Sequence, residues 1–343
     1  MGRVLSGAGR GARRTPGGRR RVARWCAGVL LAPVSAVLLC RAGGVDGTTP
    51  VPQLLAFLPW LLVPAVVALV LSAGGRWPVG CVWGLLAVGV TGFFLRPHDT
   101  GRPPPTGPVR AQLRVLTANL EFGGATPGLL EALRRERPDL VAVQECAPAV
   151  CGAALEGAEV RAAYPFRRIV GGGDAEGSAI LSRFPLEPDG GVRGRLAMPG
   201  ALVRVPGSGG EVRLRFQVAH PMPPVPGGVG VWRTELGRIR DMAAGRGAVA
   251  TVIAGDFNAS QDHAAFRAVL DTGMRDSAAA VGRARTPTWP AGSQRLGVRL
   301  GVRLGVQIDH VLVSAAVEPR SARFLDLGGT DHRALVVDAG LRG

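Results

Sequence analysis

The stretch Val252-Ile253-Ala254-Gly255-Asp256-Phe257-Asn258-Ala259 joins an apolar run to a polar end. Residues 248–254 are short, apolar and rich in β-branched side chains, which predicts a buried strand rather than a helix. Asp256 and Asn258 follow Gly255 and stand two residues apart. In extended geometry both side chains point to the same side at the carboxyl end of the strand, where a site would lie. An Asx turn is the alternative for this stretch taken alone.

The same arrangement recurs along residues 111–343. Further predicted strands cover residues 113–119, 140–143, 178–182, 212–218, 307–313 and 334–337, and predicted helices cover 127–137, 232–244 and 261–270. The polar residues at or beside the ends of these strands are Asn119, Glu121, Glu145, His220, Asp309, Asp331 and His332. The repetition favours a site over a turn at Asp256.

The residue types indicate the chemistry. Glu145, Asp256 and Asp331 offer the hard oxygen ligands that Mg²⁺ or Mn²⁺ prefers, whereas asparagine and histidine side chains orient groups and carry protons. The chain has neither a Gly-x-Ser-x-Gly nucleophile elbow nor a Gly-x4-Gly-Lys-Ser/Thr phosphate loop. A metal-assisted reaction is therefore favoured over a serine hydrolase or a P-loop enzyme.

Several of these residues also have a structural interpretation. His220 precedes a proline and could lie in a surface turn, Asp309 could pair with an arginine, and Glu121 could face solvent. Arg183 could neutralise a substrate phosphate or form a structural ion pair, and Trp289 could stack on a substrate or pack under its loop.

The remaining histidines are assigned no catalytic role. His310 is adjacent to Asp309 in a strand and should face the opposite way. His263 and His98 are expected to be solvated.

The first hundred residues differ in composition from the rest. The sequence predicts an arginine-rich cytoplasmic tail at 1–24, a transmembrane region at 25–95 with spans near 25–41, 53–74 and 77–95, a proline-rich linker at 96–110 and a domain at 111–343. A secretory signal peptide is the alternative for the first apolar run.

Arginine placement predicts the orientation of these spans. Eight arginines precede the first span and Arg76 lies between the second and third, so both regions are expected in the cytoplasm. Three spans would place the domain outside the cytoplasm, in a multi-pass protein of the cell membrane. Cys146 and Cys151 could form a disulfide there or remain as two thiols.

The net charge of +16 divides unevenly along the chain. Half of it lies in residues 1–24, where contact with anionic lipid explains it. From residue 111 onward, 28 arginines face 23 acidic residues, an excess compatible with an anionic substrate. Tandem Arg-Leu-Gly-Val repeats from Arg295 to Val306 are interpreted as a slipped duplication, with a basic clamp over the site as the alternative.

Seven short motifs occur in a fixed order. They are Thr-Ala-Asn119-Leu-Glu121, Val-Gln-Glu145, Gly-x-Ala-Ile-Leu-Ser-Arg183-x-Pro, Ala-His220-Pro, Gly-Asp256-Phe-Asn258, Ile-Asp309-His and Thr-Asp331-His332-Arg. Together they resemble the endonuclease/exonuclease/phosphatase family, which includes deoxyribonuclease I-like nucleases, abasic-site endonucleases, neutral sphingomyelinases and inositol polyphosphate 5-phosphatases. The resemblance covers residues 111–343 and suggests a membrane-tethered bacterial member.

The resemblance implies a four-layer α/β sandwich, with two mixed β-sheets flanked by helices, preceded by about three transmembrane helices. It implies that Glu145 is the main Mg²⁺ ligand, supported by Asn119, Glu121 and Asp331. It further implies that His332 is the base or the transition-state partner at the phosphate, with Asp309 orienting its imidazole. Asp256 would align or deprotonate the attacking water, Asn258 would bind a phosphate oxygen and His220 would serve the leaving oxygen.

The predicted function is therefore a monomeric, membrane-anchored, Mg²⁺- or Mn²⁺-dependent phosphoester hydrolase. Its substrate would be a nucleic acid, a phospholipid or an inositol phosphate, and its apolar helices would contact the lipid bilayer. The alternative is a non-catalytic membrane module that binds anionic lipid or nucleic acid.

Overall fold

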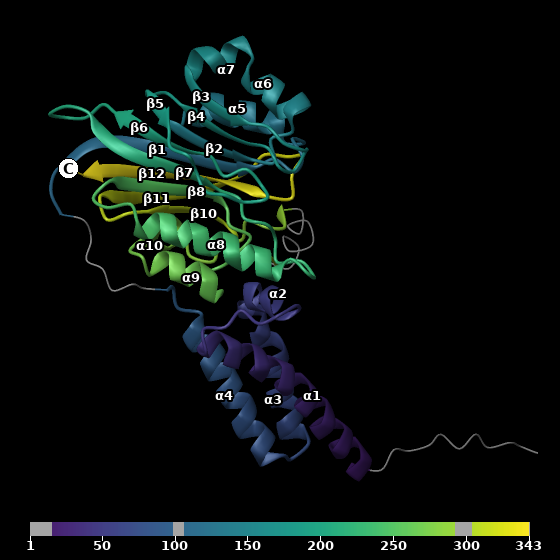
Figure 1. The fold of residues 1–343 in the computed structure, drawn as a ribbon. Helices are drawn as coiled ribbons and strands as arrows, with labels where there is room; N and C mark the ends of the chain where they lie inside the picture. Colours follow the sequence, from purple (N-terminus) through teal and green to yellow (C-terminus); the bar gives the residue numbers. More distant parts are fainter. Residues whose placement is uncertain (1–15, 99–105, 292–303, 343) are drawn as a thin grey trace, which may run out of the picture. The chain divides into compact units, whose positions relative to one another are not determined.

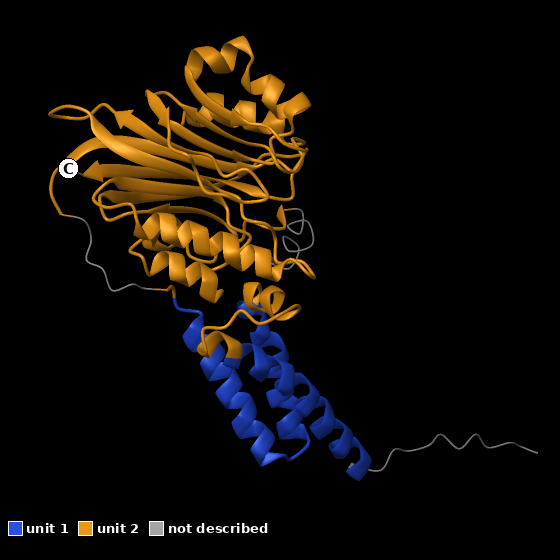
Figure 2. Cartoon of the chain, in the orientation of Figure 1, with its two compact units in different colours: residues 1–39, 58–96 blue, residues 40–57, 97–343 orange. Residues whose placement is uncertain are grey.

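A computed structural model describes residues 16–98, 106–291 and 304–342, which form two compact units (Figure 2). Unit 1 comprises Met1–Leu39 and Leu58–Arg96, and unit 2 comprises Cys40–Phe57 and Pro97–Gly343. Most of the arginine-rich tail, part of the predicted linker and most of the Arg-Leu-Gly-Val repeats lie outside the described residues.

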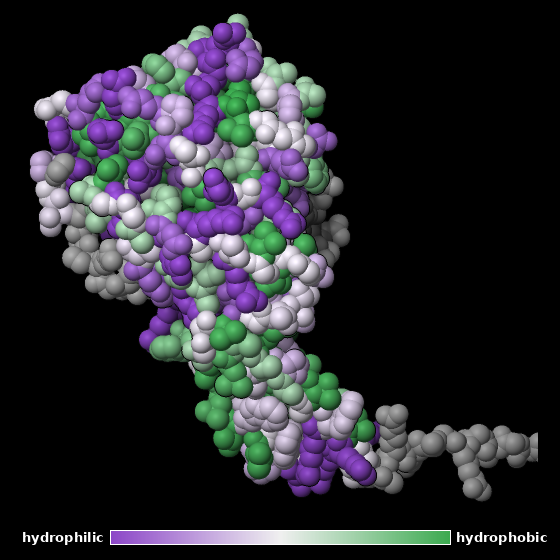
Figure 3. Space-filling view, viewed as in Figure 1, coloured by the Kyte–Doolittle hydropathy of each residue, from purple (hydrophilic) through white to green (hydrophobic). Residues whose placement is uncertain are grey.

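Unit 1 is helical. It holds most of α1 (Pro16–Ala42) together with η1 (Leu58–Leu61), α3 (Leu62–Gly74) and α4 (Pro78–Phe94). Within it, Arg24 Nε donates to the Gly75 carbonyl at 2.9 Å and Trp83 Nε1 donates to Ser35 Oγ at 2.8 Å. Apolar side chains cover much of the surface of this unit (Figure 3).

The expectation of about three spanning helices is not met. Among the described residues one helix, Gly17–Ala42, is long and apolar enough to cross a membrane, and Leu58–Gly74 and Pro78–Phe94 are shorter apolar helices. The second apolar run is interrupted, because α2 (Val51–Ala56) is a separate helix that belongs to unit 2. Helix α4 has 17 residues and is about 26 Å long, which is less than the roughly 30 Å hydrocarbon core.

Two mixed sheets of six strands each form the centre of unit 2 (Figure 1). The first has the order β11-β12-β1-β2-β4-β3, and the second has the order β5-β6-β7-β8-β10-β9. Their bounds are β1 Val109–Asn119, β2 Leu140–Gln144, β3 Phe166–Val170, β4 Ser178–Ser182, β5 Leu186–Pro188, β6 Gly200–Val205, β7 Val212–Ala219, β8 Ala250–Asp256, β9 Arg275–Asp276, β10 Asp309–Val313, β11 Val317–Asp326 and β12 Arg333–Arg342. The parallel pairs are β1 with β2 and β7 with β8.

Alternation along β8 explains the layers. Val252 and Ala254 face the apolar core between the two sheets, whereas Ile253 faces a second core beneath helices α8 (Val229–Ala244) and α9 (Ala264–Leu270). A third core lies between the first sheet and the helices around α5 (Thr126–Glu136), α6 (Ala153–Leu155) and α7 (Ala158–Ala163). The remaining helices are η2 (Pro148–Gly152) and α10 (Ser277–Ala280). The predicted α/β sandwich of two mixed sheets flanked by helices is confirmed.

Residues 40–57, here called the strap, lie against the loop that precedes α9. The Asp46 carboxylate accepts hydrogen bonds from the backbone N–H groups of Ala264 and Ala265 at 2.6 and 3.1 Å, so it caps a helix 218 residues away. Arg41 Nε lies 3.3 Å from the Asp262 carboxylate. The strap is therefore an integral part of unit 2.

His263 binds the strap, and its expected solvation is wrong. The side chain is 1% exposed. Its Nδ1 accepts from the Ser260 backbone N–H at 2.9 Å, so Nε2 is left to donate to the Pro52 carbonyl at 2.8 Å. His98 is also engaged, with Nε2 2.9 Å from the Asp271 carboxylate.

Candidate active site

Strand directions bring the predicted site residues to one edge of the two sheets. Asn119 and Asp256 end β1 and β8, while Glu145 and His220 directly follow β2 and β7. Asp309 begins β10, and its partner across the antiparallel β8 is Asp256. Strand β12 is antiparallel to β1, so its start, next to His332, reaches the same edge.

His332 and Asp309 form the buried centre of the site. His332 Nδ1 lies 3.0 Å from Asp309 Oδ2, and His332 Nε2 lies 3.9 Å from Asp256 Oδ2. The Asp309 backbone N–H donates to Thr288 Oγ1 at 3.1 Å, which fixes the start of β10. Among the described residues, Asp309 pairs with His332 and with no arginine, so the alternative of an arginine salt bridge is wrong.

The charges in this centre differ from those of the free side chains. Burial alone would lower the pKa of His332, but Asp309 and Asp256 outweigh burial and raise this pKa to about 10, so the imidazole is a cation. Burial raises the pKa of Asp256 to about 7, although His332 opposes the shift. The Asp309 carboxylate is the hydrogen-bond partner of His332, and Asp256, with its raised pKa, can accept a proton near neutrality.

Asn119 connects Asp256 to Glu145. Its Nδ2 donates to Glu145 Oε1 at 3.0 Å and to Asp256 Oδ2 at 3.2 Å. The Phe122 backbone N–H donates to the other oxygen of Glu145 at 3.0 Å. Glu145 has a φ of 52°, a left-handed conformation that is rare outside glycine and turns its side chain out of the line of β2.

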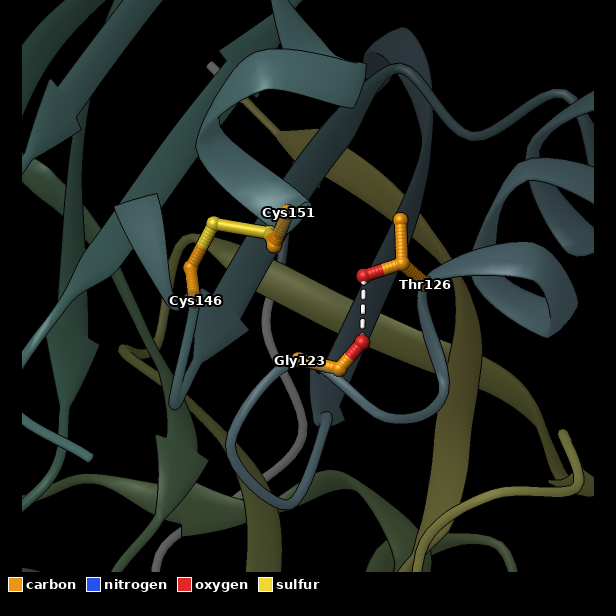
Figure 4. The surroundings of a disulfide bond; sticks show 4 residues. All are labelled: Gly123, Thr126, Cys146 and Cys151. Atoms are coloured by element: carbon orange, nitrogen blue, oxygen red, sulfur yellow. Dashed lines mark hydrogen bonds between the residues drawn. A yellow bond between two sulfur atoms is a disulfide. The ribbon is translucent and has the colours of Figure 1, made fainter. Parts of the chain in front are cut away.

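A disulfide follows Glu145 directly. Cys146 and Cys151 are bonded, with 5.0 Å between their Cα atoms (Figure 4). Nearby, Thr126 Oγ1 donates to the Gly123 carbonyl at 2.6 Å and holds the start of α5 (Figure 4). The structure thus contains the disulfide that the sequence left open, and this bond restrains the loop that carries Glu145.

Glu121 and Asp331 complete the acidic side of the site. Glu121 Oε2 accepts from the Asp331 backbone N–H at 2.7 Å, and the Glu121 N–H donates to Asn119 Oδ1 at 3.0 Å. Trp289 Nε1 donates to Asp331 Oδ2 at 2.7 Å. Glu121 is therefore bound within the site and does not simply face solvent.

His220 and Asn258 lie on the side of the second sheet. Burial lowers the pKa of His220 to about 3, so its imidazole is neutral. His220 Nε2 is 3.9 Å from Glu145 Oε1, and Nδ1 has no hydrogen-bond partner in the described part of the chain. Asn258 Nδ2 donates to the Pro221 carbonyl at 3.0 Å, and its backbone N–H donates to Asp256 Oδ1 at 2.8 Å.

A cavity of about 560 Å³ joins these residues. Four carboxylates line it, those of Glu121, Glu145, Asp256 and Asp331, and no arginine is among its described lining residues. In a chain with 41 arginines, this excess of hard oxygen ligands without a cationic side chain other than histidine fits a divalent cation.

Two sets of residues could hold that cation. Asp256, Asp309 and His332 offer ligand atoms within 4.8 Å of one another. However, Asp309 already binds His332, whose positive charge would repel a metal ion. Of the ligands predicted from the sequence, Glu145, Glu121 and Asp331 line the cavity, and their role as metal ligands together with Asn119 stays a prediction.

Comparison with known proteins agrees with this arrangement. The family model for the endonuclease/exonuclease/phosphatase family matches residues 116–332, which contain every candidate catalytic and metal-binding residue predicted from the sequence. The chain belongs to this family. None of the curated proteins compared with the chain matches it.

Solved structures of other endonuclease/exonuclease/phosphatase proteins share the fold. A family protein from Beutenbergia cavernae is 23% identical, with a TM-score of 0.52, over 68% of this chain and 72% of its own. An AP endonuclease from Archaeoglobus fulgidus and a humanized D. rerio TDP2 are each 17% identical, with TM-scores of 0.51, over 67% of this chain and 100% and 99% of theirs. At these sequence identities, the similarity shows a shared fold only.

Arg183 and His310 lie outside the site of this family member. Arg183 Nη1 pairs with Asp139 at 3.3 Å, which supports the structural interpretation. His310 faces the opposite side of β10, as expected, with Nδ1 2.7 Å from Asp276. Sequence reasoning missed Thr288 and the contribution of the strap, because only the folded chain brings them beside β10 and the cavity.

Proposed function

We propose that this family member is a divalent-metal-dependent hydrolase of phosphoesters. The observation that carries the proposal is the His332–Asp309 pair at 3.0 Å, placed beside Asp256 and next to an acidic cavity whose described lining residues include no arginine. A module that only binds anionic lipid or nucleic acid would need cationic side chains around its site, and the described lining residues do not include them.

Glu145, Asn119, Glu121 and Asp331 would hold Mg²⁺ or Mn²⁺. The bound ion would neutralise the charge that develops on the phosphoryl oxygens. The roles of the other residues follow from their own geometry and protonation.

Asp256 is the proposed proton acceptor for the attacking water. Its raised pKa lets Oδ2 take a proton near neutrality. His332, as a cation held by Asp309, stabilises the negative charge of the transition state and does not act as a base. Because His220 is neutral, it donates a hydrogen bond to the leaving oxygen, and Asn258 orients a phosphoryl oxygen.

Replacing Glu145 with glutamine is expected to weaken Mg²⁺ binding by about 10- to 100-fold, because a charged ligand beside Asn119 is lost. Titration calorimetry on the full chain measures this change, and Glu211→Gln, at an exposed glutamate of the β6–β7 turn, is the matched control. Hydrolysis of bis-p-nitrophenyl phosphate, plasmid DNA and sphingomyelin is assayed in parallel, with and without EDTA. Absence of both Mg²⁺ binding and hydrolysis would refute the proposed function.

We also propose that the protein is a monomer anchored in the cell membrane, with unit 2 outside the cytoplasm. Support comes from α1, from the exposed apolar side chains of unit 1 such as Trp25, Val70 and Leu86, and from the disulfide, which suits an oxidising compartment. The arginines before α1 favour a cytoplasmic N-terminus. A phosphatase reporter fused after Leu95 is expected to be active outside the cell, and activity confined to the cytoplasm would overturn the orientation.

A further inference from the structure

The cavity of the candidate active site has an apolar side that the proposed chemistry does not use. Besides the carboxylates, its lining includes the apolar residues Ala56, Phe57, Phe122, Met222, Val225 and Trp289. Phe122 and Val225 are 56% and 46% exposed, so this side opens to solvent. Water attack on a phosphate requires no such surface, and an exposed apolar surface beside a reactive centre indicates a ligand with an apolar part.

Part of this apolar side comes from the strap. Ala56 and Phe57 line the cavity, and the ring of Phe57 packs edge-on against Trp289, with 6.5 Å between the ring centroids. Trp289 in turn binds Asp331, a proposed metal ligand, at 2.7 Å. The apolar wall is thus continuous with the acidic side of the cavity.

Buried contacts hold the strap in this position. Asp46 caps α9, and His263 donates to the Pro52 carbonyl within the segment that forms the wall. Gln53 Nε2 donates to the Pro224 carbonyl, which ties the strap to the loop that carries Val225. The residues that fix the strap follow His220 and Asp256 along the chain, so one pair of loops carries both catalytic groups and the attachments of the wall.

The charged residues that line the cavity favour one class of phosphoester over another. A nucleic acid presents several phosphates, and proteins that bind it neutralise them with arginine or lysine. The described lining residues provide neither, whereas apolar side chains occupy the surface beside the reacting position. A phosphoester with a single phosphate and an apolar substituent matches this surface, and a polyanion does not.

We propose that the strap and the loop at Val225 form an apolar subsite beside the reacting phosphate, and that this subsite takes the alkyl or acyl chain of an amphiphilic phosphodiester. This inference depends on the proposed function and adds the class of substrate. The strap lies outside residues 116–332, which match the family, and in sequence it is preceded by most of α1 and followed directly by η1.

A series of p-nitrophenyl alkyl phosphates tests the subsite on the full-length protein with Mg²⁺ in a fixed concentration of mild detergent. The methyl, butyl and hexyl esters share one leaving group and one charge, so the ratio of their kcat/KM values reports the alkyl chain alone. The hexyl ester is expected to exceed the methyl ester by at least about tenfold, since each buried methylene group adds a favourable transfer free energy.

Substitutions in the apolar wall test whether the preference for longer alkyl chains arises there. Phe57→Asn and Phe57→Leu introduce side chains that are similar in size to each other but differ in polarity. The ratio of kcat/KM for the hexyl and methyl esters is expected to fall at least about fivefold with asparagine and to persist with leucine. Val225→Thr, which keeps the volume and adds a hydroxyl group, provides an independent variant at an exposed position and is expected to lower the ratio.

Each outcome has a distinct meaning. Equal hydrolysis of all three esters would overturn the apolar subsite while leaving the proposed function in place. A chain preference that survives both Phe57→Asn and Val225→Thr would overturn its assignment to this wall, and faster hydrolysis of oligonucleotides than of the hexyl ester would overturn the substrate class. Failure to hydrolyse any phosphoester would overturn the proposed function itself.

Discussion

Replacing His332 with alanine is expected to lower kcat/KM for phosphodiester hydrolysis by about 10²- to 10³-fold. The variant loses the cation that faces the reacting phosphate, and it leaves the Asp309 carboxylate buried without the partner now 3.0 Å away. His332→Asn separates the two effects, because its amide can donate to Asp309 but carries no charge. Steady-state kinetics at a temperature where each variant is folded measures the change.

A matched control uses His310, a buried histidine of β10. His310→Asn removes an imidazole that binds Asp276 on the opposite side of β10. We expect this substitution to lower the thermal unfolding temperature. It should leave kcat/KM within about threefold of the original value, because His310 lies outside the candidate site. A loss of activity equal to that of His332→Ala would show that packing, rather than charge, explains the effect.

The coupling of His332 to Asp309 can be measured by a double-mutant cycle. If the two side chains act as one unit, Asp309→Asn combined with His332→Ala should cost little more in rate than His332→Ala alone. Additive losses would contradict the proposed pairing.

Replacing Gly255 with alanine is expected to lower the free energy of unfolding by about 3 kcal/mol or more, because the added methyl group overpacks a buried strand. A Cβ atom at this position would lie 1.9 Å from the Ala219 carbonyl oxygen of β7, so β7 and β8 would have to separate. His220 and Asp256 directly follow these two close residues. Chemical denaturation measures the loss, and activity should fall with it.

Gly237→Ala is the control for this substitution. Gly237 lies inside α8, and nothing is within 4 Å of the position that its Cβ would occupy. Alanine in a helix interior should increase the free energy of unfolding by about 1 kcal/mol. A Gly255→Ala variant as stable as the original chain would refute the close approach of the two strands.

The sandwich and the strand ends could be predicted because their signals are local. The apolar run before Asp256 and the alternation in residues 212–218 each reflect which side of a strand is buried. Polar residues at the strand ends were then brought together by strand direction. Their catalytic and metal-binding roles stay predictions.

The remaining features depend on contacts that local patterns do not contain. His263 follows an ordinary turn in the sequence, and only the docking of Pro52 makes it a buried hydrogen-bond donor. The apolar character of residues 53–57 predicted the start of a membrane span, because hydropathy does not distinguish a bilayer from the wall of a cavity. The structure shows a separate short helix here, α2, which belongs to unit 2 and contributes to the cavity wall.

The capping of α9 by Asp46 also has a consequence for the order of folding. The two ends of this contact are separated by 218 residues, so the ribosome must complete most of unit 2 before the strap can bind. The apolar helices on either side of the strap are synthesised well before the helix and loops that hold it. Closure of the active-site wall is therefore expected to be a late, long-range step of maturation, with hydrolysis of amphiphilic substrates appearing only after the sheets have formed.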